Sequence, residues 1–424
     1  MVQLAENYPE CVQGITVMPP SAKLYVPLSQ HIGKICDSLV KTGDYVYKGQ
    51  KIGDSSAKVF AAVHAPVSGT VVGVEDWPHP VIGRCKAVII DNDHQEKINS
   101  VHVPGEDAIA HLSAEAIRSL VFEAGIVGMG GASFPTFIKL NSSKPLDSLI
   151  INGAECEPYL SADNCLMLEN GKEIIAGIEL IRRCTNVKNI YIAIEDNKPE
   201  AIDVFRKLCR GRDYHVKPLV SDYPQGGERQ LIKSILRREV PSGKLPFDVG
   251  VLVHNVATVY AIYGAVYLAK PLFERVVTVA GDCFKTSRNC LIRVGTPIKD
   301  IVSFCGPLVK DPKKIVFGGP MMGVAQFSLE TPIIKSTDGV LAFFDIDTKP
   351  EVEMPCVRCT RCVRACPAGL LPCMIAMASE KEKWDLAKAY GCLDCIECGA
   401  CDYVCPQEKN LVQAIRQAKV RSPR

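Results

Sequence analysis

Two runs of four cysteines, each followed directly by a proline, constrain the fold of this chain more than any other feature. In both runs the cysteines are separated by two, two and three residues. Two-residue spacers place three thiolates on one short loop, where they can bind three irons of a single cube, and in two-cluster ferredoxins the fourth cysteine binds the other cluster. The spacing therefore predicts two 4Fe–4S clusters, one held by Cys356, Cys359, Cys362 and Cys405, the other by Cys395, Cys398, Cys401 and Cys366.

Two alternatives to this ligand assignment come from the same region. Zinc sites usually pair two-cysteine knuckles, without a run that repeats in this form. Cys392 precedes Cys395 at the same two-residue spacing, so a register that begins at Cys392 is an alternative; we favour the register that ends at Cys405 because it mirrors the first run. We interpret Cys392 and Cys373 as buried thiols that pack beside a cluster.

The composition indicates where such a protein works. The chain has 424 residues and 20 cysteines, and its charge is nearly balanced, with 49 basic and 47 acidic residues. Secreted disulfide scaffolds are usually short, with cysteines throughout, whereas half of these cysteines crowd one end. The balanced charge gives no indication of nucleic-acid binding. We therefore expect reduced thiols and a cytoplasmic protein, soluble or peripheral to the cytoplasmic face of the cell membrane.

One nearly charge-free stretch, residues 249–269, is about long enough to span a bilayer. His254, Asn255 and Gly264 interrupt it, and its pattern predicts a buried strand that runs into a buried helix.

The rest of the chain divides into three segments. Residues 1–98 are rich in short β patterns, and their motifs GDYVYKGQ and APVSGTV resemble the lipoyl/biotinyl hammerhead fold; Lys58, between them, is interpreted as a plain surface lysine. In residues 99–270, buried strands at 149–152 and 189–194 alternate with helices near 113–124, 171–184 and 198–210, which favours a Rossmann-like α/β layer. Residues 271–345 return to β structure, and 346–424 form the cysteine module, which closes with a helix at 411–420.

A glycine-rich loop in the α/β segment is a candidate phosphate site. Gly128, Gly130 and Gly131 lie close together and are followed by Lys139. Glycines allow backbone amides to approach a phosphate, and the lysine adds positive charge. Taken alone, such a loop is a weak motif.

Further motifs make a resemblance specific: GMGGASFPTFIKL, INGAECEPYL, YPQGGERQLI, REVPSGKLPFDVGV and FGGPMMG. Together they resemble the C subunit of the Rnf electron-transport complex over nearly the whole chain, and more distantly the NADH- and FMN-binding subunit of respiratory complex I. The resemblance implies a multidomain α/β fold: a hammerhead barrel over 1–98, a Rossmann-like FMN and NADH domain over 99–270, a soluble-ligand-binding β-grasp domain over 271–345, and a two-cluster ferredoxin domain over 346–424.

The resemblance also implies a set of cofactor contacts. FMN would lie on the glycine loop and Lys139; the flavin pocket would include Asn152, Glu155 and Glu157, with Glu228 near the nicotinamide and Asn255 and Thr258 near a phosphate. The residues by themselves permit a loop salt bridge at Glu155 and Glu157 and a helix cap at Asn255 and Thr258. Met129 and Ala154 depart from the complex I pattern, which has an arginine and an acidic residue there.

The function implied is that of an NADH-linked oxidoreductase subunit. A hydride would pass between NADH and FMN, and single electrons would pass through the clusters to a redox partner such as Rnf membrane subunits or ferredoxin. Hydride transfer needs no side chain as acid or base, so we predict no catalytic residue. The alternatives are a soluble Rnf-C-like protein that serves a reductase such as proline reductase, a flavin-free iron–sulfur relay, and a zinc-stabilised interaction protein.

Overall fold

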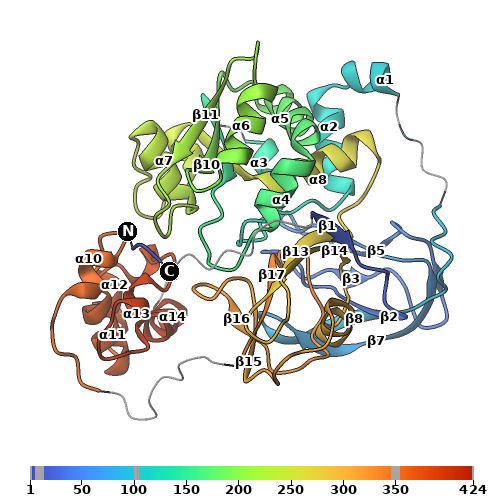
Figure 1. Ribbon diagram of the computed structural model, residues 1–424. Coiled ribbons are helices and arrows are strands. Elements are labelled where there is room, and N and C mark those ends of the chain that lie inside the picture. The colour runs from blue at the N-terminus through green and yellow to red at the C-terminus, as the bar shows by residue number, and fades with distance from the viewer. Residues whose placement is uncertain are drawn as a thin grey trace.

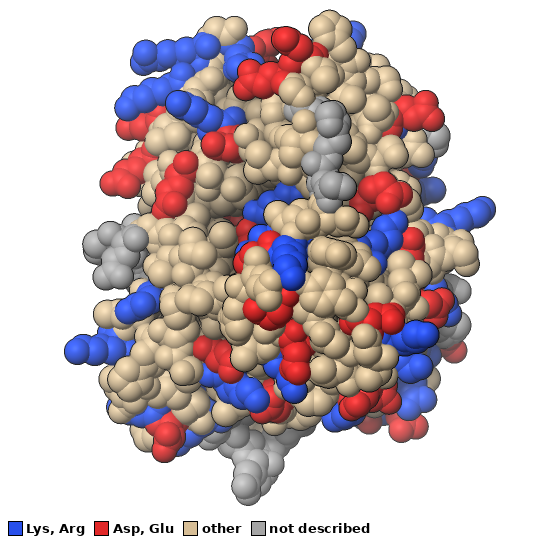
Figure 2. All heavy atoms as spheres, turned by 90° about the vertical axis from the view of Figure 1, so that its right-hand side faces the viewer, with Lys and Arg blue, Asp and Glu red and all other residues tan. Residues whose placement is uncertain are grey.

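The computed structural model describes residues 2–4, 14–99, 103, 105–142, 144–344 and 354–422. Figure 1 shows a parallel-sheet layer at the top, N-terminal sheets at the lower right, a second large sheet in the lower centre, and the cysteine module at the lower left. Figure 2 shows that positive and negative side chains are interspersed over one face of the molecule, as the nearly balanced composition predicts. Within the described residues, no helix is long and apolar enough to cross a membrane.

The N-terminal part forms two small antiparallel sheets. One has the order β2-β8-β7-β4 and the other the order β3-β5-β6. Alternating residues point inward, and side chains such as Leu24, Val71 and Ile90 form a closed apolar core between the sheets. The strands are β2 (Lys23–Pro27), β3 (Asp37–Ser38), β4 (Tyr45–Val46), β5 (Lys51–Asp54), β6 (Val63–His64), β7 (Gly69–His79) and β8 (Gly83–Asn92).

The next part is a parallel sheet with the order β11-β10-β9-β12, built from β9 (Ser148–Gly153), β10 (Asn189–Glu195), β11 (Tyr214–Leu219) and β12 (Val251–Asn255). Every residue of β9 is buried, because helices cover both faces: Leu149 and Ile151 join one apolar core, and Ile150 joins the other. The strands and helices predicted here are confirmed, and the charge-free stretch is a buried strand, β12, that leads into a largely buried helix, α8.

The helices of this part are α1 (Glu106–Ala110), α2 (Ala114–Glu123), α3 (Thr136–Leu140), α4 (Ala162–Glu169), α5 (Gly171–Thr185), α6 (Pro199–Leu208), α7 (Glu228–Leu236) and α8 (Val256–Tyr267), with a 3₁₀ turn η1 (Pro246–Val249) before β12. The chain passes from β9 outward to β10 and β11 and then returns to the other side of β9 to form β12. The sheet therefore has a topological switch point between β9 and β12, where open α/β sheets bind ligands.

A six-stranded mixed sheet follows, with the order β1-β14-β13-β17-β15-β16. Its strands are β1 (Ile15–Val17), β13 (Glu274–Ala280), β14 (Arg288–Arg293), β15 (Lys314–Phe317), β16 (Val324–Ala325) and β17 (Gly339–Phe343), with helix α9 (Ile298–Cys305). The strand β1 lies within the first predicted segment, yet it pairs in parallel with β14. Residues 15–17 are thereby bound to this sheet.

The cysteine module contains α10 (Arg361–Ala365), α11 (Pro372–Glu380), α12 (Trp384–Ala389), η2 (Cys392–Asp394), α13 (Ala400–Tyr403) and α14 (Leu411–Arg421). Ile375 of α11, Ala387 of α12 and Ile415 of α14 pack together in one small apolar core. The predicted closing helix is confirmed as α14, which lies against the cysteine loops.

Candidate functional site

The switch point brings together several residues that the sequence predicted for flavin binding. Asn152 lies near the end of β9 and Asn255 ends β12, and the two pair in the strand register. The Asn255 side-chain oxygen accepts a hydrogen bond from the Ala257 amide at 2.8 Å, so Asn255 caps helix α8 as the simpler alternative proposed. The N-terminus of α8 therefore lies at the switch point, where it can attract an anion.

The glycine loop lies over the same edge of the sheet. The Gly128 amide donates to the Phe134 carbonyl at 2.8 Å and closes the loop, while the Met129 amide donates to the Thr258 hydroxyl at 2.9 Å. A Cβ added at Gly130 would come within 3.1 Å of the Asn255 Cβ, so the loop approaches the α8 cap closely because residue 130 has no side chain. Gly130 and Gly131 are exposed at the loop tip, where a ligand could reach their amides.

Lys139, on α3, pairs with another predicted site residue. Its ammonium donates to the Glu228 carboxylate at 2.5 Å and to the Val253 carbonyl at 3.1 Å. Glu228 is the first residue of α7, and the lysine side chain is largely buried. The structure thus joins the lysine predicted near FMN to the acid predicted near the nicotinamide.

Asn152 holds a second loop, the one that contains Gly226, at the switch-point edge of the sheet. Its amide nitrogen donates to the Gly226 carbonyl at 2.9 Å, and its amide oxygen accepts from the Ala154 amide at 3.0 Å. The neighbouring Gln225 is buried, and its side-chain oxygen has no hydrogen-bond partner in the part of the chain that the structure describes. A buried polar atom without a protein partner fits a site that a polar ligand completes. Gln225 was not among the predicted site residues, although it lies within the YPQGGERQLI motif.

Glu155 follows β9 and caps a helix. Its carboxylate accepts hydrogen bonds from the Asp163 and Asn164 amides, at 3.0 and 3.1 Å, at the start of α4. Burial, with the nearby Asp163 charge, raises the pKa of Glu155 to about 8. Asp163 accepts from the Asn255 side chain at 2.6 Å, and burial raises its pKa to about 6. Sequence reasoning missed Asp163, which belongs to none of the recognised motifs.

Glu157 reaches away from the parallel sheet. Its carboxylate accepts hydrogen bonds from the amides of Met321 and Met322, at 3.0 and 2.8 Å, in the FGGPMMG loop. Burial raises the pKa of Glu157 to about 7. Glu157 therefore links the parallel-sheet layer to the six-stranded sheet, while Glu155 stays at the switch-point edge.

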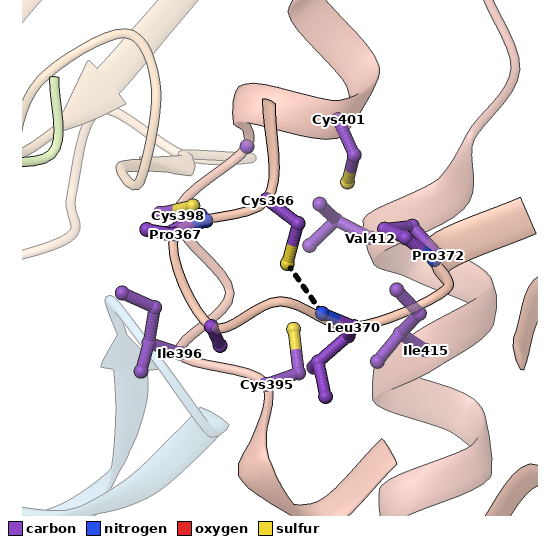
Figure 3. A pocket seen from close by; sticks show the side chains of 12 residues that line it. Cys366, Pro367, Leu370, Pro372, Cys395, Ile396, Cys398, Cys401, Val412 and Ile415 are labelled. Carbon is purple, nitrogen blue, oxygen red and sulfur yellow. Dashed lines mark hydrogen bonds between the residues drawn. The ribbon is translucent and has the colours of Figure 1, made fainter. Parts of the chain in front are cut away.

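Four of the eight predicted ligand cysteines line one cavity, shown in Figure 3: Cys366, Cys395, Cys398 and Cys401. The rest of the lining is mostly apolar and includes Leu370, Ile396 and Ile415. The Leu370 amide donates to the Cys366 sulfur at 3.4 Å, and the Glu397 amide donates to the Cys395 sulfur at 3.3 Å. Such amides favour the thiolate form that a metal requires.

The chemistry of this cavity fits an iron–sulfur cluster. Burial, together with the neighbouring thiols, raises the pKa of Cys398 to about 11 and also raises that of Cys401. A bound metal charge would offset this cost, and a donor set made only of sulfur suits iron in clusters. In the described residues, no group of three or more His, Cys, Asp or Glu side chains is arranged to hold a single metal ion. The four sulfurs instead surround a space.

The other four predicted ligands lie nearby. Cys362 is buried, contacts Cys373, and belongs to the same apolar cluster as Cys401, so the two cysteine runs are adjacent. Cys356, Cys359 and Cys405 are partly exposed. Cys392 is fully buried in another apolar cluster, with its sulfur 3.7 Å from the Ser422 hydroxyl, and it does not line the cavity.

Comparison with known proteins gives two family matches. Residues 121–264 match the Nuo51 FMN-binding domain, and residues 9–95 match the RnfC barrel sandwich hybrid domain. Among solved structures, an NAD⁺-reducing [NiFe]-hydrogenase in the H₂-reduced state shares the fold over 77% of this chain and 68% of its own, with a TM-score of 0.53 and 18% identity.

Two relatives match over most of their length. The chain is 44% identical to the C subunit of the proton-translocating ferredoxin:NAD(+) oxidoreductase complex of Clostridium ljungdahlii, over 96% of this chain and 89% of the relative. It is 41% identical to the C subunit of the Na(+)-translocating ferredoxin:NAD(+) oxidoreductase complex of Acetobacterium woodii, over 93% and 89%. The chain therefore belongs to the family of C subunits of ion-translocating ferredoxin:NAD⁺ oxidoreductase complexes, the Rnf family.

Proposed function

We propose that this chain is a flavo-iron–sulfur subunit that passes electrons between NAD(H), FMN and two 4Fe–4S clusters. The observation that carries the proposal is the pairing, in one chain, of a glycine loop packed at the switch point of a parallel sheet with a cavity lined by four cysteine sulfurs. The relatives' names specify ferredoxin and NAD⁺ as the redox partners of their complexes. The chain is accordingly an oxidoreductase subunit that works with the other subunits of its complex, peripheral to the membrane.

The finer domain description is part of this proposal. Residues 1–98 would form a hammerhead barrel, 99–270 a Rossmann-like FMN and NADH domain, 271–345 a soluble-ligand-binding β-grasp domain, and 346–424 a two-cluster ferredoxin domain. The two N-terminal sheets, the parallel sheet, the six-stranded sheet and the helical cysteine module support it. The pairing of β1 with β14 means that the third domain also recruits residues 15–17.

At the switch point, FMN would supply the conversion between two-electron and one-electron transfer. The amides of the glycine loop and the N-terminus of α8 would hold its phosphate, because unpaired backbone N–H groups and the helix dipole attract an anion. Lys139 would contact FMN as one member of an ion pair with Glu228, and Asn152 holds the Gly226 loop against the site. Burial and the nearby Asp163 charge raise the pKa of Glu155, which lies beside this site. No side chain is assigned as a catalytic acid or base.

The order of the clusters follows from what surrounds them. The parallel-sheet layer, which would bind the flavin and is called the flavin layer below, contacts the residue just before the second cysteine run: Arg229 and Ser242 both bond to Asp394, at 3.4 and 2.5 Å. The cluster on Cys395, Cys398, Cys401 and Cys366 would therefore exchange electrons with the flavin. The cluster on Cys356, Cys359, Cys362 and Cys405 would exchange electrons with the partner protein.

The test is a cofactor analysis of anaerobically purified, reconstituted protein. We expect about eight irons per chain, FMN released on denaturation, and NADH-dependent reduction of an artificial acceptor. A spectrum with iron–sulfur absorption alone would favour the flavin-free relay. Colourless protein that stays free of paramagnetic signals after reduction would favour zinc.

The glycine loop can be tested by one substitution. Gly130→Ala should weaken FMN binding about tenfold, because the new Cβ would meet the Asn255 Cβ at 3.1 Å and push the loop from the α8 cap. Gly105→Ala is the matched control, since a Cβ there meets nothing within 4 Å. Fluorescence titration of the apoprotein with FMN measures the affinity. Equal affinities for the two variants would place the flavin elsewhere.

A further inference from the structure

Tyr223 joins the flavin layer to the second cysteine run through a hydrogen bond of its side chain. Its side chain is 2% exposed, and its hydroxyl donates to the Cys398 carbonyl at 2.6 Å. Tyr223 lies three residues before Gly226, whose carbonyl Asn152 holds at the switch point. A short path of backbone bonds and two hydrogen bonds thus connects the proposed flavin site to the backbone of a predicted cluster ligand.

The surroundings of Tyr223 hold its ring in place. The ring belongs to an apolar cluster with Cys398 and Ala400 from the cysteine module and Met321 from the FGGPMMG loop. The Tyr223 backbone exchanges hydrogen bonds with Val2, at 2.8 and 2.9 Å. Three separate parts of the chain therefore meet at this ring.

Packing alone does not explain why residue 223 carries a hydroxyl. A phenylalanine would fill the same apolar space, whereas a buried phenol must also satisfy its O–H. Here the O–H crosses the seam between layer and module to the Cys398 carbonyl, next to Gly399, and the Glu157 carboxyl lies beside it. A Cβ at Gly399 would lie 2.7 Å from the Met321 carbonyl oxygen, so the two sides approach closely there too.

We propose that Tyr223 is a positioning residue that holds the Cys398 loop against the flavin layer and so sets the rate of electron transfer between flavin and cluster. The inference rests on the proposed function. In the step concerned, one electron leaves the reduced flavin and enters the cluster, and Tyr223 gains or loses neither an electron nor a proton. Removing the hydroxyl should slow this step while hydride transfer from NADH continues as before.

The experiment uses the full chain with both clusters and FMN, mixed rapidly with NADH. Flavin reduction is followed by absorbance and cluster reduction by paramagnetic resonance of freeze-quenched samples. Tyr223→Phe should slow cluster reduction about three- to tenfold, the effect of one hydrogen bond on a docking equilibrium. Flavin reduction, FMN content and iron content should match those of the unaltered protein. Tyr403→Phe is the control, an exposed tyrosine of the same module.

A second variant tests the seam from the module's side. Gly399→Ala keeps Tyr223 but places a Cβ 2.7 Å from the Met321 carbonyl oxygen, so the two sides of the seam must move apart. This variant should also slow electron transfer from the flavin to the cluster. Unchanged cluster reduction in Tyr223→Phe would overturn the proposal. Loss of half the iron in that variant would overturn it as well, since the hydroxyl would then serve cluster assembly. Absence of FMN from the unaltered protein would instead contradict the proposed function.

Discussion

The two cysteine runs have the same spacing but different surroundings. In the second run, the two-residue spacers between the first three cysteines are enclosed: Gly399 and Ala400 are buried, and Ile396 is partly buried. In the first run the corresponding positions are open, with Val357 57% exposed and Arg358 and Arg361 exposed. The second run faces the flavin layer through Tyr223, whereas the first presents apolar and basic side chains to solvent.

This difference shows that the motif and its environment specify separate properties. The spacing selects the ligands of a cluster. The burial of the loop decides which partner can come near that cluster, because electron transfer needs close approach. We call the cluster on Cys395, Cys398, Cys401 and Cys366 the inner cluster, and the cluster on Cys356, Cys359, Cys362 and Cys405 the outer cluster. We therefore expect the inner cluster to exchange electrons with the flavin and the outer cluster to exchange electrons with another protein.

The largest effect is expected when a single cysteine substitution in one run removes one cluster and leaves the other. Cys398→Ser and Cys359→Ser should each lower the iron content from about eight to about four per chain. Cys359→Ser should leave NADH-dependent reduction of the inner cluster intact and abolish transfer to a protein acceptor. Cys398→Ser should abolish NADH-dependent reduction of the remaining cluster, because the outer cluster loses its link to the flavin.

Paramagnetic resonance after addition of NADH or of dithionite distinguishes the two variants. Dithionite should reduce the remaining cluster in both, and NADH only in Cys359→Ser. Cys392→Ser is the control and should retain both clusters, because Cys392 does not line the cavity. NADH-dependent reduction in Cys398→Ser at the normal rate would reverse the assigned order.

A smaller effect concerns how the stability of the region around the inner cluster depends on pH. The pKa of Glu157 is raised by burial from 4.5 to about 7. Between these values the folded chain keeps a proton that the unfolded chain has released, so stability falls as pH rises and levels off above pH 7. The loss amounts to about 3 kcal/mol across this window. Glu157→Gln, which cannot titrate, should flatten this part of the pH profile.

This loss of stability should appear at the inner cluster and not at the outer cluster. Glu157 bonds to the loop that carries Met321, which packs on Cys398, so the inner cluster should be lost at lower denaturant as pH rises from 5.5 to 7. Urea titrations followed by the resonance signal of each cluster provide the measurement. Glu115→Gln, at an exposed position on α2, is the control. A profile for Glu157→Gln as steep as that of the unaltered protein would contradict the prediction.

The sequence was informative where function depends on neighbours along the chain. The cysteine spacing identified the four thiols of the cavity, and hydrophobic runs located β9, β10, β12 and α14. The cap at Asn255 could be foreseen because its partner, Ala257, is two residues away.

Contacts across long separations were not foreseeable from local patterns. Glu157 bonds to amides 164 and 165 residues away, and Tyr223 bonds to a carbonyl 175 residues away. Such pairs depend on how separate layers pack, and neither partner carries a local signal of the other. The pairing of β1 with β14 is of the same kind, since a three-residue strand pairs with whichever edge the fold offers it.

The smallest effect concerns the charge near the outer run. Arg361 lies between Cys359 and Cys362 and is exposed, and its positive charge favours the reduced, more negative state of a nearby cluster. At a separation of about 10 Å and an effective dielectric constant of about 40, removing it costs about 0.8 kcal/mol. That corresponds to about 35 mV for one electron. Arg361→Gln should lower the potential of the outer cluster by this amount.

The inner cluster serves as the internal control for this shift. Glu397, a charged residue between its cysteines, already pairs with Arg416 and Lys419, so its surroundings should not change in Arg361→Gln. A redox titration monitored by paramagnetic resonance gives both potentials in one sample. An equal shift of both signals would mean that the two runs share one electrostatic environment, and the contrast between an inner and an outer cluster would then rest on contacts alone.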